Sequence, residues 1–329
     1  MRIAPNQPEE APSRTAASDA AVRVAFVGAG KVGCSLAMHL AHTPECAAQV
    51  PADTSVRQST LPSGAPSPAA VRIVGFASAT PEHAREAAAF AGGEAFRTAA
   101  EAAAAADVVF LTTPDGQIAA AWDELAQATR SGRLDLSGKV VCHCSGALPS
   151  SVLAGADELG AHACSVHPLY AVSSRFESWR ELAHCWFTLE GDQEATDLVA
   201  GLLRARGSQV ATIDAAEKTR YHAAAVMASN LVVGLYEEAS QQLVRCGFPM
   251  GDAQQALAAL FLGNAEHLAR DGVDAALTGP AARGDAGTIA AHLRTLDGDD
   301  REIYRLLTEV LYRIAARRSR AAERSETGS

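Results

Sequence analysis

The stretch AVRVAFVGAGKVG, which begins at Ala21, most constrains what this chain can fold into. Residues 22–27 are apolar and rich in β-branched residues, and we expect them to form a buried strand. The next six residues fit the pattern G-x-G-x-x-G and lead directly into the helical sequence CSLAMHLAH. Between a strand and a helix, such glycines permit a tight turn, close approach of a pyrophosphate, and close helix–strand packing. We therefore predict that a dinucleotide binds through its phosphates at Gly28, Ala29, Gly30, Lys31, Val32 and Gly33.

The end of the second expected strand, residues 71–78, indicates which dinucleotide this is. Sites specific for NAD usually carry an acidic residue there, bonded to the ribose 2′-hydroxyl. This chain instead has Ala77-Ser78-Ala79-Thr80, with Arg85 close behind. Hydroxyl groups and a guanidinium can hold a 2′-phosphate, and no carboxylate repels it. We predict NADP rather than NAD as the cofactor, with Ser78 at its 2′-phosphate end. The alternative for the whole region is that the glycine turn binds no ligand.

Strands alternate with helices as far as Asp214 and then cease. Alternation of this length implies right-handed crossovers and a mainly parallel sheet. Beyond Asp214 the sequence predicts one long helix over 217–246 and further helices over about 252–270, 285–296 and 301–320. The predicted fold class is therefore α/β, with a Rossmann-type, mainly parallel sheet domain over 22–214 and an all-helical domain over 215–320.

Three segments fall outside these expected domains. Residues 1–21 mix Pro, Glu, Arg and Ser without an apolar core, and we expect a disordered tail rather than a signal peptide. Residues 44–70, rich in Pro, Ser and Ala, are longer than a compact helix-to-strand connection requires, so we predict a surface insertion. The polar residues 321–329 are expected to form a second disordered tail.

Composition excludes several classes of partner. The formal net charge of −10 argues against nucleic acid and anionic membranes, because both require a basic face. Charged or small residues interrupt every apolar run well before the length of a transmembrane helix. Seven cysteines at irregular spacing do not form a disulfide framework and indicate a reduced, cytoplasmic chain. We expect a small-molecule substrate.

Polar residues follow three of the expected strands. Ligands of open α/β sheets lie outside the carboxyl ends of the strands, where this sequence has Thr113-Pro114, Ser145-Gly146 and His167. We predict that Thr113 and Pro114 contact the cofactor and that Gly146 contacts the substrate. The Ser145 hydroxyl and the His167 imidazole can bond a substrate oxygen and transfer its proton. A polar turn residue before proline is an equal interpretation of His167.

Cysteine and histidine alternate near one of these strand ends. Cys142 and Cys144 share a strand face and His143 points away, with His162 and Cys164 nearby. The spacing fits no common zinc pattern, and small buried cysteines are ordinary in strands. We therefore predict no metal site.

Two further candidates lie in the expected helical domain. Lys218 and His222 are one helical turn apart and share a face. Arg283 lies in the glycine-flanked loop of LTGPAARGD, ahead of Asp285 as a helix N-cap, and can clamp a carboxylate or phosphate. The alternative for Lys218 is a solvated charge at the start of a helix. The alternative for Arg283 is an exposed side chain that binds nothing.

Together, the motifs GAGKVG, HCSGALPS, HPLY, KTRYHAAAVMASN and LTGPAARGD resemble those of the bacterial Rossmann-like oxidoreductases that carry a C-terminal domain of unknown function, number 2520. The motifs span residues from about 22 to 296. The resemblance implies a fold like that of 6-phosphogluconate dehydrogenase and a nicotinamide cofactor.

More distantly, the chain is similar to prephenate dehydrogenases, β-hydroxyacid dehydrogenases, ketopantoate reductase and pyrroline-5-carboxylate reductase. The prephenate enzymes carry a serine and a His-Pro after neighbouring strands, which implies that His167 exchanges the proton while Ser145 orients it. The hydroxyacid and ketopantoate enzymes carry Lys-x-x-x-Asn, in which Lys218 matches the lysine but His222 replaces the asparagine.

The resulting expectation is an NAD(P)-dependent oxidoreductase acting on CH–OH groups. His167 or Lys218 would supply the proton, Ser145 and His222 would orient the substrate, and Arg283 would bind an anionic tail. One alternative is imine reduction, that is CH–NH chemistry of the pyrroline-5-carboxylate reductase type. Another is a sensor that binds NADP without turnover. By analogy with proteins that carry such a helical domain, we expect a homodimer.

Overall fold

The computed structural model describes residues 21–42 and 70–327. Except for Ala21 and Ala70, the N-terminal tail expected over 1–21 and the insertion expected over 44–70 therefore lie outside the described residues. The described chain divides into two compact units, one ending at Ala225 and the other beginning at Val226. This division lies later than the boundary expected after Asp214, because the helix that contains Lys218 belongs to the first unit.

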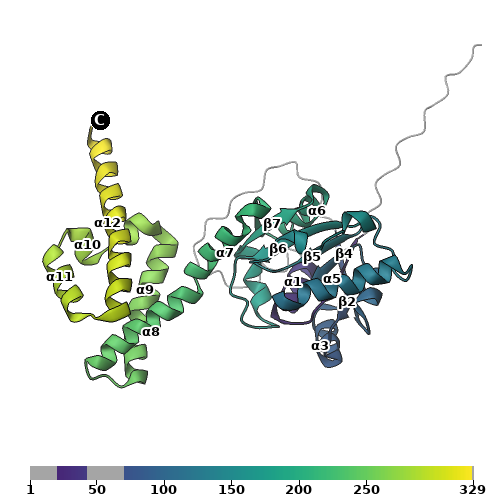
Figure 1. Cartoon of the computed structure of the whole chain (residues 1–329), viewed down its shortest axis with the longest axis horizontal. Coiled ribbons are helices and arrows are strands. Elements are labelled where there is room, and N and C mark those ends of the chain that lie inside the picture. The colour runs from purple at the N-terminus through teal and green to yellow at the C-terminus, as the bar shows by residue number, and fades with distance from the viewer. Residues whose placement is uncertain (1–20, 43–69, 328–329) are drawn as a thin grey trace, which may run out of the picture. The chain divides into compact units, whose positions relative to one another are not determined.

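The first unit is built on an eight-stranded sheet with the order β3-β2-β1-β4-β5-β6-β7-β8 (Figure 1). All neighbouring strands are parallel except β6 and β7, which confirms the predicted mainly parallel sheet. The strands are β1 Val22–Val27, β2 Val71–Ala77, β3 Glu94–Phe96, β4 Val108–Leu111, β5 Val140–His143, β6 His162–Pro168, β7 Trp186–Gly191 and β8 Gln209–Thr212.

Helices cover the sheet and bury one core on each of its faces. Along β1, Val24 and Phe26 belong to one core and Ala25 and Val27 to the other, because successive strand residues point to opposite faces. The α-helices of this unit are α1 Lys31–Ala41, α3 Pro81–Ala91, α4 Ala99–Ala105, α5 Asp115–Arg130, α6 Gln193–Arg204 and α7 Lys218–Met227. Short 3₁₀ helices are η1 Ser150–Val152, η2 Asp157–Leu159, η3 Ser178–Arg180, η4 Leu182–His184 and η5 Ala215–Glu217.

Between β2 and β5 the chain forms several short elements with weak local signals as well as the longer helix α5. Strand β3 has three residues, too few for a period-two pattern to show. The alanine-rich α4 begins with a capping box between Thr98 and Glu101. Helix α5 buries Ile118, Trp122 and Leu125, which share one helix face. These elements complete the crossovers on either side of β4.

The second unit, as described, is all-helical, as predicted. Its helices are α8 Asn230–Arg245, α9 Met250–Ala276, α10 Gly279–Arg283, α11 Ala286–Thr295 and α12 Gly298–Thr327. Helix α9 is kinked at Gly272, which has φ +81°. None of the helices in the described ranges is long and apolar enough to cross a membrane.

Three expectations about these helices were wrong. The single helix predicted over 217–246 is two helices, because Ser229 leaves the helical region with φ −127° and ψ −85°. Serine and alanine interrupt an apolar pattern without a Gly or Pro signal, so the break was not visible. Arg283 lies at the end of the short helix α10 rather than in a loop. Residues 321–327 continue α12 instead of forming a tail, since no helix breaker occurs before Gly328.

Candidate functional site

The glycine turn joins β1 to α1 beside β4, at the point where the strand order reverses. Gly28 has φ +112°, and a Cβ atom there would lie 2.6 Å from the Thr112 backbone carbon. A Cβ at Gly33 would lie 2.5 Å from the carbonyl oxygen of Gly28, whereas Gly30 faces open space. Gly28 and Gly33 thus have the turn and packing geometry expected of the first and third glycines of the motif, and Gly30 leaves the backbone accessible to a ligand.

Free hydrogen-bonding groups surround this turn. Among the described residues, no side chain caps the N-terminus of α1, so its first backbone N–H groups can bind an anion. After β4, the Thr113 hydroxyl is buried and has no hydrogen-bond partner in the described part of the chain, while Pro114 is the N-cap residue of α5. A buried, unpaired hydroxyl is costly unless a ligand satisfies it. The residues present therefore fit a dinucleotide, with Thr113 and Pro114 where they were predicted.

The end of β2 is more open. The Ser78 hydroxyl accepts a hydrogen bond from the Thr80 N–H at 3.3 Å. Arg85 forms an exposed ion pair with Glu82, one turn earlier on α3. Its guanidinium is already engaged by a carboxylate, but an exposed pair of this kind contributes little and can exchange partners. The preference for NADP over NAD stays a prediction at this position.

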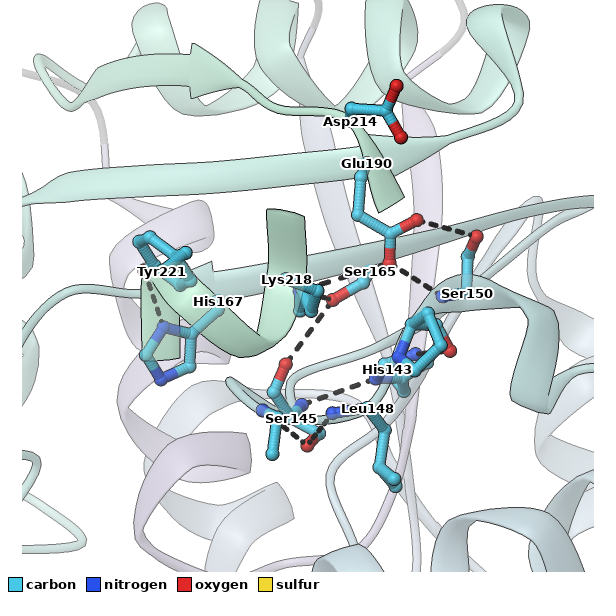
Figure 2. A network of polar contacts seen from close by, with 12 residues as sticks. His143, Ser145, Leu148, Ser150, Ser165, His167, Glu190, Asp214, Lys218 and Tyr221 are labelled. Atoms are coloured by element: carbon cyan, nitrogen blue, oxygen red, sulfur yellow. Dashed lines mark hydrogen bonds and ion pairs between the residues drawn. The ribbon is translucent and has the colours of Figure 1, made fainter. Parts of the chain in front are cut away.

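Lys218 is buried at the start of α7 and contacts two strands of the sheet (Figure 2). Its ammonium donates a hydrogen bond to the Ser165 hydroxyl, which in turn donates to the Ser145 carbonyl at 3.3 Å. The Lys218 Nζ atom also lies 3.9 Å from Oε1 of Glu190, and both side chains are 1% exposed. We call Lys218, Ser165, Glu190 and Ser150 the Lys218 network.

Ser150 completes this network from the other side of Glu190. Its backbone N–H donates to Oε1 at 2.6 Å and its hydroxyl donates to Oε2 at 2.8 Å. Burial lowers the pKa of Lys218, and the Glu190 carboxylate opposes that change. The ammonium thus lies within a closed set of protein contacts that anchors α7 to β6 and β7.

The Ser145 hydroxyl is also fully engaged. It donates to Oδ2 of Asp115 at 2.7 Å and accepts from the N–H groups of Ala147 and Leu148 at 3.2 and 3.0 Å. Ser145 is 3% exposed. In this arrangement the hydroxyl shapes the turn after β5 and holds the neighbouring Gly146 in place.

A second group of side chains, the His167 cluster, comprises Gly146, His167, Tyr221 and His222. The His167 Nδ1 atom lies 2.7 Å from the Tyr221 hydroxyl (Figure 2). The rings of His167 and His222 lie edge to face with centroids 6.2 Å apart. A Cβ atom at Gly146 would lie 2.8 Å from Nε2 of His167 and 2.6 Å from Cδ2 of His222. Glycine is therefore required where the turn after β5 meets the two imidazoles.

Electrostatics keep the His167 imidazole neutral. Burial, together with the charges of Lys218 and His222, lowers its pKa to about 4, while Asp115 opposes them. A neutral imidazole carries one N–H donor and one acceptor nitrogen, so it can hydrogen-bond a substrate without bringing a buried charge.

The structure brings together most of the predicted catalytic residues but divides them between two environments. His167 and His222 share the His167 cluster, whereas Lys218 lies in the adjacent network and Ser145 is bonded to Asp115. Arg283 is exposed in the second unit, and its role stays a prediction.

Sequence reasoning missed Tyr221 and Glu190. Tyr221 is three residues after Lys218 and therefore shares its helix face, which was a readable signal. Glu190 ends an apolar strand segment and gave no signal of burial. The Cys142 and Cys164 thiols lie 3.4 Å apart on neighbouring strands and are fully buried. Within the described ranges, no group of three or more His, Cys, Asp or Glu side chains is arranged to hold a metal.

Two family models match separate parts of the chain. The model of a Rossmann-like domain matches residues 67–168, and that of the domain of unknown function 2520 matches residues 185–310. The resemblance inferred from the sequence motifs is thereby confirmed, although the first match begins after the glycine turn. A comparison with curated proteins found no match.

Solved structures share the fold over most of the chain. Protein TM1727 from Thermotoga maritima is similar with a TM-score of 0.65 at 23% identity, covering 89% of this chain and 98% of that one. BF3122 from Bacteroides fragilis, described as a candidate NADP oxidoreductase, has a TM-score of 0.60 at 23% identity, covering 90% and 100%. A pyrroline-5-carboxylate reductase from Coxiella burnetii has a TM-score of 0.53 at 15% identity, covering 89% and 97%.

Proposed function

We propose that this protein is an NADP-dependent oxidoreductase that transfers a hydride between the nicotinamide and a carbonyl or hydroxyl carbon of a small, anionic substrate. The observation that carries this proposal is the arrangement at one edge of the sheet. The parallel strands β1, β4, β5 and β6 end there, and they carry the glycine turn, the unpaired Thr113 hydroxyl, the Gly146 turn and the His167 imidazole. The name of the Bacteroides fragilis protein supports the choice of NADP.

The chain's own residues supply binding and proton transfer in this proposal. NADPH, when bound, supplies the hydride. The N–H groups at the start of α1 and the hydroxyl of Thr113 hold the dinucleotide. His167 hydrogen-bonds the substrate oxygen, stabilises the negative charge that develops on it, and supplies its proton.

Burial separates the two candidate proton donors. Lys218 is 1% exposed and its ammonium is held by Ser165 and Glu190, so a substrate oxygen cannot reach it without breaking that network. His167 is only partly buried, and its Nε2 atom has no protein hydrogen-bond partner among the described residues. We therefore propose His167 as the proton donor and Lys218 as a residue that positions α7.

NADPH oxidation measured against a panel of oxo acids and cyclic imines tests the proposal, with NADH as the cofactor control. We expect turnover of at least one oxo acid, and a loss of about 10²–10⁴-fold in kcat/KM for His167→Ala. His162→Ala is the matched control, since His162 begins the same strand at its other end and pairs with Glu194. Tight NADPH binding without turnover of any panel member would instead favour the sensor function.

We further propose that the second unit pairs with that of a second copy. In support, α8, α9 and α12 expose large apolar side chains in the single chain: Leu231, Val233, Leu260, Leu262, Leu306 and Leu307. Exposed apolar residues gathered on a few elements mark interaction surfaces. Light scattering of the full chain is expected to give a dimer mass, and of the variant V233D/L260D a monomer mass. A monomeric wild-type chain would refute this part of the proposal.

A further inference from the structure

The pairing of Tyr221 with His167 has a chemical consequence beyond the proposed function. The two rings lie edge to face, with centroids 5.6 Å apart and an interplanar angle of 84°. The phenol oxygen lies 2.7 Å from Nδ1 of the imidazole. Tyr221 lies on the same face of α7 as Lys218, whose buried network anchors the helix to the sheet. The phenol is therefore held at one ring nitrogen.

The hydrogen bond between the two rings contains one proton, and its direction can be inferred. Burial raises the pKa of Tyr221, so the phenol keeps its O–H, and burial lowers the pKa of His167 to about 4, so the imidazole is neutral. A phenol O–H is a stronger donor than an imidazole N–H, and an imidazole nitrogen is a stronger acceptor than a phenol oxygen. The favourable direction is thus from the Tyr221 hydroxyl to Nδ1.

The opposite side of the imidazole faces Gly146. A Cβ atom at that position would lie 2.8 Å from Nε2 and 2.6 Å from Cδ2 of His222, so only a glycine lets the backbone approach the imidazole this closely. A neutral imidazole that accepts at Nδ1 carries its proton on Nε2. The group presented beside Gly146 is therefore an N–H donor.

We propose that Tyr221 is a positioning residue that holds His167 as the Nε2–H tautomer, so that this site takes a hydrogen-bond acceptor, the oxygen of a carbonyl compound. A protonated imine carries an N–H in place of that oxygen and offers no lone pair to Nε2–H. When the Nε2 proton passes to the product alkoxide, the Tyr221 proton passes to Nδ1. The starting state is restored when Nε2 takes a proton from water and Nδ1 returns its proton to the phenolate. The substrate class rests on the proposed function, whereas the tautomer does not.

The tautomer can be measured without any substrate. In the full chain with ¹⁵N-labelled histidine, ¹H–¹⁵N spectra distinguish a protonated ring nitrogen from an unprotonated one, and the spectrum of H167Q identifies the signals of His167. For wild type we expect a protonated Nε2 and an unprotonated Nδ1. For Tyr221→Phe we expect both tautomers to be populated. A protonated Nδ1 in wild type, or a tautomer unchanged in Y221F, would overturn the proposal.

The chain offers a matched control for this substitution. Tyr304 in α12 bonds Nδ1 of His292 at 2.7 Å, with ring centroids 5.6 Å apart and an interplanar angle of 89°. Tyr304→Phe therefore removes the same kind of hydrogen bond at an exposed position, and we expect it to leave the His167 signals unchanged. An equal change of the His167 signals in Y304F would show that they report a general effect on the fold, and would overturn the assignment to Tyr221.

The substrate class is tested with the oxo acids and cyclic imines already described. We expect oxo acids to be reduced and the cyclic imines, assayed at a pH low enough to protonate them, to be left unchanged. Reduction of the imines alone would overturn the acceptor assignment. If neither class is reduced, the proposed function and the substrate class fail together, while the spectra still decide the tautomer.

Discussion

Replacing Lys218 by methionine tests whether this lysine supports the fold or acts on a substrate. Methionine is unbranched and apolar, so it fills similar space but leaves the Glu190 carboxylate buried without its cation. At 3.9 Å and an effective dielectric constant of about 20, the attraction between the two charges is about 4 kcal/mol. Removing one partner of a buried pair costs about 3–5 kcal/mol, because the other charge remains uncompensated.

The two hydrogen bonds from Ser150 to Glu190 place the expected loss at the lower end, about 3 kcal/mol. For a unit of this size, such a loss lowers the melting temperature by about 6–12 °C. In the double variant Lys218→Met with Glu190→Gln, no uncompensated charge remains. We therefore expect the double variant to be more stable than K218M alone, by about 1–2 kcal/mol.

The measurement is thermal and urea unfolding at neutral pH, together with NADPH binding and turnover. Arg220→Met is the matched control, because Arg220 lies on the same helix in an exposed ion pair with Glu217. We expect that variant to remain within about 0.5 kcal/mol of wild type. If K218M melts like wild type while its turnover is lost, Lys218 acts on the substrate directly and our interpretation of the Lys218 network is wrong.

Three further predictions concern single residues. In Gly146→Ala the new methyl group would lie 2.8 Å from Nε2 of His167. We therefore expect kcat/KM to fall by about 10²-fold while the affinity for NADPH is retained. Equal losses of kcat/KM and of NADPH affinity would argue for misfolding. In Gly33→Ala the methyl group would lie 2.5 Å from the Gly28 carbonyl, so a cost of about 1–3 kcal/mol and weaker NADPH binding are expected in a fluorescence titration. Burial lowers the pKa of His39 to about 3, so between pH 6.5 and 3 the unfolded state binds more protons than the folded state. The free energy of unfolding therefore decreases as the pH is lowered through this range, by up to about 1.4 kcal/mol per pH unit. Urea unfolding at pH 7 and pH 5 should show a smaller loss for His39→Gln, and an unchanged slope would contradict this.

Local features of the chain determined the class of fold. The glycine turn between an apolar strand and a helix, and the alternation of strands with helices up to Asp214, predicted the mainly parallel sheet that the structure contains. These signals depend on neighbouring residues, whose spacing sets the backbone period and the turn conformation. They also placed His167 and Gly146 at the edge where the strands end, since parallel strands end together.

The tertiary structure decided which of these polar residues remain available for chemistry. The sequence presented Lys218 and His222 as one face of a helix, yet Lys218 is enclosed by Ser165 and Glu190 from two distant strands. Tyr221, three residues after the lysine, bonds His167 instead.

Burial and hydrogen-bond partners are set by residues far apart in the chain, and no local pattern records them. The break at Ser229 was hidden for a related reason, because a helix of small and apolar residues can end without a glycine or proline. The sequence by itself therefore determined the sheet, the turn and the candidates, whereas only the packing of α7 against β6 and β7 separated the buried cation from the imidazole.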